Sequence, residues 1–75
     1  MRPIPKPSFL DQCEPIGARD GQRRWRRLDL KRIYTWDAVH GEIEAFNERG
    51  RHVAVLDAVT DEPIKGAVPG RRIDV

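Results

Sequence analysis

The chain has 75 residues and a formal net charge of +2, with 39% hydrophobic and 35% charged residues. This length allows one small domain and excludes a large multi-step enzyme, but it leaves room for a small nuclease, a binding module or a toxin domain. No apolar run approaches the about 18 residues that a membrane span requires. No apolar segment follows Met1 and Arg2 either, so we expect neither a membrane span nor a secretory signal peptide. The single cysteine, Cys13, excludes an internal disulfide and a cysteine-based zinc site.

The first 21 residues differ in composition from the rest. Prolines at positions 3, 5 and 7 predict an extended tether with no core of its own. Ser8 can cap a short helical turn, with Asp11 in the acidic position of a capping box. Residues 17–21 are typical of a loop. We therefore expect residues 1–21 to be a tether with a possible short helix, and residues 22–75 to form the functional domain.

The densest basic stretch is residues 22–32, with the sequence QRRWRRLDLKR. In an extended strand, alternate residues point to opposite sides, so Arg24 and Arg26 share one side and Arg23 and Trp25 the other. A basic patch beside an aromatic side chain suits a phosphate backbone, although a solvated strand face has the same pattern. Arg23, Arg24 and Arg26 are therefore candidate substrate-binding residues.

The remaining elements follow one another at hairpin spacing. Residues 31–36 are rich in β-branched and aromatic side chains, residues 42–47 alternate in polarity, and residues 52–57 and 64–65 follow short turns. Such short connections imply antiparallel pairing. We predict an α+β fold that is mainly β: a twisted antiparallel sheet of about four or five strands with at most one short N-terminal helix. We expect Trp25, Tyr34 and Trp36 in the core and His52 at the surface.

Candidate chemistry lies in residues 37–44, DAVHGEIE. His40, Glu42 and Glu44 share one side of an extended chain. Asp37 has the opposite parity and joins them only if the chain bends, which Gly41 permits. A carboxylate can take the proton of an RNA 2′-hydroxyl, an imidazolium can protonate the leaving 5′-oxygen, and an arginine can stabilise the phosphorane. An RNase without a metal is one interpretation; solvated acids and a divalent-metal site on His40 and the carboxylates are the others.

Residues 33–44, IYTWDAVHGEIE, resemble the active-site segment of the ribosome-inactivating colicin RNases, whose pattern is I-Y-x-W-D-x-x-H-G-E-[LI]-E. The resemblance spans residues 22–73 and continues through Gly50, Asp57 and Lys65 to an arginine near the end of the chain. It implies a highly twisted antiparallel sheet. It also implies the toxin domain of a bacteriocin or a contact-dependent toxin, which cuts 16S ribosomal RNA at the decoding site and stops translation.

The resemblance also implies a site and its partners. It assigns Glu44 as general base, His40 as general acid, Asp37 as the residue that orients His40, and Arg71 as the phosphorane stabiliser. The acid and base labels are interchangeable on the sequence. Further substrate-binding positions are Glu42, Phe46, Lys65 and Arg72, with Arg72 also an alternative to Arg71 at the phosphate.

Among these positions, we expect Phe46 to offer a face for base stacking because it shares parity with Glu44. No metal and no cofactor are implied. The expected partners are the ribosome with its 16S RNA and an acidic cognate immunity protein. We expect a monomeric domain without stable membrane insertion, delivered from the producing bacterium to the cytoplasm of a target bacterium. A noncatalytic basic RNA-binding module and a metal-dependent nuclease are the alternative functions.

Overall fold

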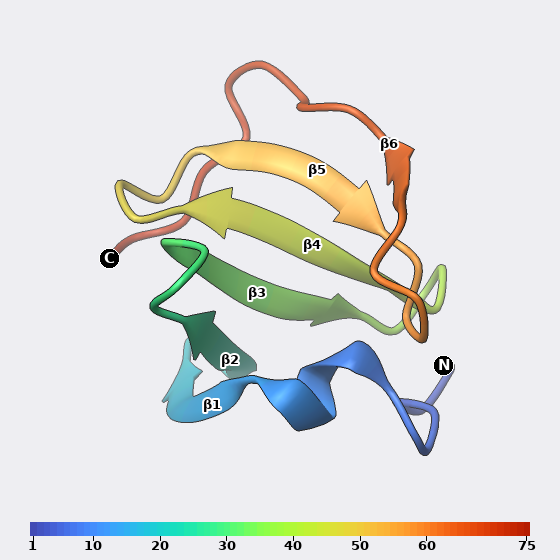
Figure 1. Cartoon of the computed structure of the whole chain (residues 1–75). Helices are drawn as coiled ribbons and strands as arrows, with labels where there is room; N and C mark the ends of the chain where they lie inside the picture. The colour runs from blue at the N-terminus through green and yellow to red at the C-terminus, as the bar shows by residue number, and fades with distance from the viewer.

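The structure, a computed structural model, describes residues 1–75. One antiparallel sheet takes up most of the chain, and each strand pairs with the next one in sequence (Figure 1). This confirms the prediction of a mainly β, antiparallel fold. No helix has the length and apolar character needed to cross a membrane. The elements in chain order are the 3₁₀ helix η1 (Phe9–Gln12) and the strands β1 (Glu14–Arg19), β2 (Gln22–Arg27), β3 (Arg32–Asp37), β4 (Glu42–Asn47), β5 (His52–Leu56) and β6 (Pro63–Lys65).

The alternation of residues along β4 divides the sheet into two faces. Ile43 and Ala45 are fully buried on one face, which we call the core face, and Glu42 and Glu44 point to the other, the site face. Helix η1 covers the core face and contributes Phe9 and Leu10 to it. The core cluster consists of Phe9, Leu10, Cys13, Trp25, Tyr34, Ile43, Ala45, Ala54 and Leu56.

Helix η1 begins as the sequence predicted. The Ser8 side chain accepts a hydrogen bond from the Leu10 N–H at 3.1 Å, and the Asp11 carboxylate accepts one from the Ser8 N–H at 2.9 Å. These two bonds form the expected capping box and satisfy amide donors that would otherwise be unpaired.

The N-terminal segment is more tightly bound to the sheet than expected. Residues 17–21 were predicted to be a loop, but β1 extends to Arg19, so the sheet has a sixth strand at its edge. Every residue of β1 is exposed, and Pro15 and Gly17 interrupt it, which explains why no apolar alternation marks it in the sequence. The proline-rich start is anchored as well, since the Arg2 N–H donates to the Ala38 carbonyl at 2.7 Å.

The C-terminal tail returns from β6 to the beginning of β5 (Figure 1). The His52 N–H donates to the Arg71 carbonyl at 3.1 Å, and the Ile73 N–H donates to the Gly50 carbonyl at 2.8 Å. Gly50 has φ +85°, and a Cβ at this position would overlap the carbonyl oxygen of Ile73. The close approach of the two backbones therefore depends on glycine. The tail forms no strand, but backbone pairing fixes its path.

Candidate active site

The turn between β3 and β4 brings the predicted acids together. In this hairpin Asp37 lies directly opposite Glu42, and residues directly opposite in an antiparallel pair project to the same face. Gly41 adopts φ +68°, and its N–H donates to the Asp37 carbonyl at 2.8 Å. The bend that the sequence required for Asp37 to join the other residues is therefore present.

Asp37 holds His40 in one orientation. Its Oδ2 lies 2.8 Å from Nδ1 of His40, while Oδ1 accepts the Val39 and His40 N–H groups at 3.0 and 3.2 Å. Partial burial alone would raise the pKa of the Asp37 carboxyl, but the hydrogen bonds from the His40 ring and from these amides outweigh it and lower the pKa. A charged Asp37 makes Nδ1 the protonated nitrogen of a neutral imidazole. The other nitrogen, Nε2, is left free on a side chain that is 62% exposed.

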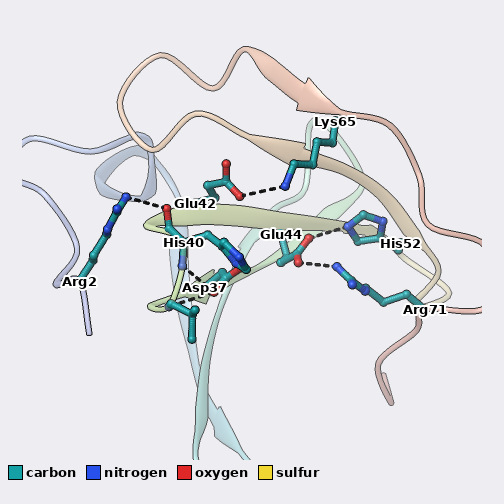
Figure 2. A network of polar contacts seen from close by, with 9 residues as sticks. Arg2, Asp37, His40, Glu42, Glu44, His52, Lys65 and Arg71 are labelled. Atoms are coloured by element: carbon teal, nitrogen blue, oxygen red, sulfur yellow. Dashed lines mark hydrogen bonds and ion pairs between the residues drawn. The ribbon is translucent and has the colours of Figure 1, made fainter.

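Glu44 lies between two basic side chains, as Figure 2 shows. Its Oε1 lies 2.6 Å from Nη1 of Arg71, and its Oε2 lies 2.6 Å from Nε2 of His52. The carboxylate is only 13% exposed. Two short hydrogen bonds of this kind fix the direction of a carboxylate. Glu44 is thus a preoriented proton acceptor.

The role of His52 differs from the sequence prediction. We expected a surface histidine, but its side chain is completely buried. The Val68 N–H donates to Nδ1 at 3.0 Å, so Nδ1 has no proton, and Nε2 carries the proton that is donated to Glu44. An irregularity in the pairing of β4 and β5 places His52 opposite Phe46. The sequence offered no signal for this position, because the regular register of β4 and β5 would place Val53, not His52, opposite Phe46.

One cavity collects the predicted catalytic residues. It has a volume of about 280 Å³, and Lys65 enters it from β6, with its Nζ 3.8 Å from Oε1 of Glu42. Because Arg71 comes from the tail, three separate parts of the chain supply the polar groups. The lining residues are Asp37, His40, Glu42, Glu44, Val55, Lys65, Val68 and Arg71.

The basic residues of β2 divide between the two faces. Arg24 lies opposite Thr35, which in turn lies opposite Glu44, so Arg24 shares the site face. Its Nη1 donates to the Asp74 carbonyl. Arg23 lies on the core face, 4.7 Å above the Trp25 ring.

The other predicted substrate-binding residues lie outside the cavity. On the site face Arg26 pairs with Glu14 at 2.7 Å. The prediction that Phe46 stacks on a base is wrong. The residue is only 3% exposed, and its ring packs edge to face against His52. It therefore offers no free ring face on which a base could stack. Arg72 does not line this cavity but lines a neighbouring one together with Arg71.

Three side chains could also hold a metal ion. Asp37, His40 and Glu42 each offer a ligand atom, and these atoms lie within 4.8 Å of one another. Nδ1 of His40 and Oδ2 of Asp37 already satisfy each other. A metal bound through both atoms would have to break that hydrogen bond.

The sequence of the chain matches that of a known protein family. The model of the Cytotoxic family matches residues 11–74, so the chain belongs to the Cytotoxic family. Cloacin of Escherichia coli is 37% identical over 51 residues, which cover 67% of this chain and 9% of cloacin. Colicin E3 of Escherichia coli is 36% identical over 53 residues, covering 69% of this chain and 10% of colicin E3. Colicin-E6 of the same species is 35% identical over 51 residues. The chain thus spans a small fraction of the length of these relatives.

Proposed function

We propose that this chain is the nuclease domain of a bacterial toxin, an endoribonuclease that needs no metal. The observation that carries the proposal is the convergence of an oriented imidazole, a held carboxylate and an arginine in one cavity. RNA supplies its own nucleophile, the 2′-hydroxyl, so these groups suffice for the chemistry. Membership of the Cytotoxic family and the similarity to cloacin and colicin E3 support the same function.

In the proposed reaction Glu44 accepts the 2′-hydroxyl proton while the 2′-oxygen forms a bond to phosphorus. His40, in its protonated form, donates the Nε2 proton to the 5′-oxygen as the phosphorus–oxygen bond breaks. The products are a 2′,3′-cyclic phosphate and a 5′-hydroxyl. Arg71 stabilises the charge of the phosphorane. Its side chain is 45% exposed, so it can turn from Glu44 toward a phosphate without disturbing the core.

His52 acts as a positioning residue in this scheme. Its Nε2 proton holds one oxygen of Glu44, and its Nδ1 holds the tail through the Val68 N–H. Arg71 lies three residues beyond Val68. One buried imidazole therefore fixes the direction of the proposed base and the segment that carries the proposed phosphate ligand.

The proposed substrate is 16S ribosomal RNA at the decoding site, where cleavage stops translation. The domain acts as a monomer in the cytoplasm of a target bacterium, after delivery as part of a larger toxin. A cognate immunity protein protects the producing cell. The sequence pI of about 9.1 suits both an RNA substrate and an acidic protective partner.

The test is primer extension on small-subunit RNA from intact ribosomes treated with the domain in the presence and in the absence of EDTA, beside His40→Ala and Val39→Ala. His40 and Val39 are neighbouring residues of the same exposed turn, so both variants should fold, which circular dichroism checks. We expect one new stop in the decoding region for the wild type and for Val39→Ala, and none for His40→Ala. A stop that EDTA removes would indicate a metal-dependent nuclease. RNA binding without any stop would indicate a noncatalytic RNA-binding module.

A further inference from the structure

A second cavity lies beside the candidate active site. It has a volume of about 430 Å³ and is enclosed by the beginning of β5 and the tail. Three arginines line it: Arg51, Arg71 and Arg72. No carboxylate contributes to its lining. We call it the arginine cavity.

Two of these arginines face one another across paired backbone. Arg51 and Arg72 form an antiparallel bridge, which places their side chains on the same side, with Cβ atoms about 5 Å apart. Like charges in directly opposite positions repel each other and destabilise the pairing. Neither residue takes part in any of the ion pairs of the protein. The pair therefore lacks the anion that would offset its repulsion.

The arginine cavity is contiguous with the candidate active site. Arg71, Val68 and His52 connect the two, since Arg71 and Val68 line both cavities and His52 contacts Glu44. Between them the tail makes a tight turn, closed by the hydrogen bond from the Arg71 N–H to the Val68 carbonyl at 3.1 Å. A strand of RNA with one phosphate at Arg71 would thus have a neighbouring phosphate beside this turn.

We propose that the arginine cavity binds a phosphodiester of the RNA backbone next to the one that is cleaved. Guanidinium groups bind phosphate oxygens through two parallel hydrogen bonds, and two unpaired guanidinium groups on one side of a short ribbon suit one phosphate. Contacts of this kind position a nucleic acid without reading its sequence. Arg72 and Arg51 therefore set the register of the substrate, while Arg71 serves the reacting phosphate. The inference rests on the proposed RNase function.

The test compares single variants that remove equal charge. Arg51→Ala and Arg72→Ala alter the arginine cavity, and Arg49→Ala, in the same turn as Arg51 but outside the cavity, is the matched control. We expect the first two to raise KM for ribosomal RNA by about 5- to 50-fold, with kcat within about twofold of wild type. The dependence of log KM on log salt should become shallower by about 0.7 for each lost phosphate contact. Arg49→Ala should change KM by less than about twofold.

A second measurement needs no cleavage. Inorganic phosphate is titrated into the ¹⁵N-labelled wild-type domain, and we expect saturable shifts of the amides of Arg51, residues 67–68 and residues 70–72 that sodium chloride at equal ionic strength does not produce. If the shifts occur but ribosomal RNA is not cleaved, the RNase proposal fails and the anion site stands. If RNA is cleaved, all three variants have the same KM as the wild type and phosphate produces no shifts, the arginine cavity proposal is wrong and the RNase proposal stands.

Discussion

His52 and Glu44 form a largely buried hydrogen bond, with 2.6 Å between Nε2 and Oε2. The direction of this bond is fixed by a third group, because the Val68 N–H occupies Nδ1 and leaves the proton on Nε2. His52 therefore has two separable contacts, one to the proposed base and one to the tail.

Two substitutions separate the contacts of His52. His52→Asn places a carbonyl oxygen near the position of Nδ1, so it keeps the bond to Val68 and loses the bond to Glu44. His52→Gln places an amide N–H near the position of Nε2 and does the reverse. We expect the Asn variant to keep slow hydrogen exchange at the Val68 amide and to lose about 10- to 100-fold in kcat, because Glu44 is no longer held. The Gln variant should retain most of kcat, with faster exchange at Val68. Full activity of the Asn variant would show that Glu44 does not need His52.

Arg23 and Arg24 are adjacent in the sequence but lie on opposite faces of the sheet. Only Arg24 shares the face of Glu44, so we expect Arg24→Ala to weaken RNA binding and to reduce the salt slope by about 0.7, the value for one contact to single-stranded nucleic acid. Arg23→Ala removes the same charge and should have little effect on binding. Fluorescence anisotropy with a short RNA at several salt concentrations measures both. Equal effects of the two variants would mean that net charge, not the face, determines binding.

Gly50 controls the docking of the tail. A Cβ at this position would overlap the Ile73 carbonyl, and the residue has φ +85°, a conformation that costs other residues about 1–2 kcal/mol. Gly21, at φ +77° with open space around it, is the control that carries only the conformational cost. We expect Gly50→Ala to lower the free energy of unfolding by more than Gly21→Ala does, and to lower kcat as well, because the tail carries Arg71. Urea denaturation and cleavage rates provide the comparison, and equal losses in the two variants would contradict the role given to this contact.

Asp57 makes stability depend on pH in the acidic range. The N–H groups of Thr60 and Val59 bind its carboxylate at 3.0 and 2.9 Å and lower its pKa in the folded protein. Because the folded pKa lies below the unfolded value of about 3.9, this stabilisation is fully present above about pH 4 and is lost as the pH falls through the folded pKa. Asp57→Asn should therefore lower the melting temperature at pH 7 and approach the wild type at about pH 2. The control is Asp61→Asn. Asp61 makes no side-chain hydrogen bond and has φ +59°, which asparagine tolerates, so this variant should keep the wild-type pH dependence.

The sequence predicted the central hairpin well because residues within β4 and the adjoining turn are enough to determine its structure. Alternation along β4 determines which side chains share a face, and Gly41 allows the turn that brings Asp37 opposite Glu42. Strand β1 was missed because all of its residues are exposed, so burial leaves no pattern in it. The burial of Phe46 and His52 depends on how β5 and the tail pack on β4, which parity within one strand cannot reveal.

The order of the strands has a consequence for how the site is assembled. Each strand pairs with its neighbour in sequence, so the sheet can grow by successive local hairpins with little loop-closure entropy to overcome. The tail is different, because it pairs beside the beginning of β5 and not with β6, its neighbour in sequence. A chain in which the hairpins have formed but the tail has not docked contains Glu44 and His40 without Arg71 in place. Partly folded molecules should therefore be inert, and cleavage activity would report completion of folding rather than its onset.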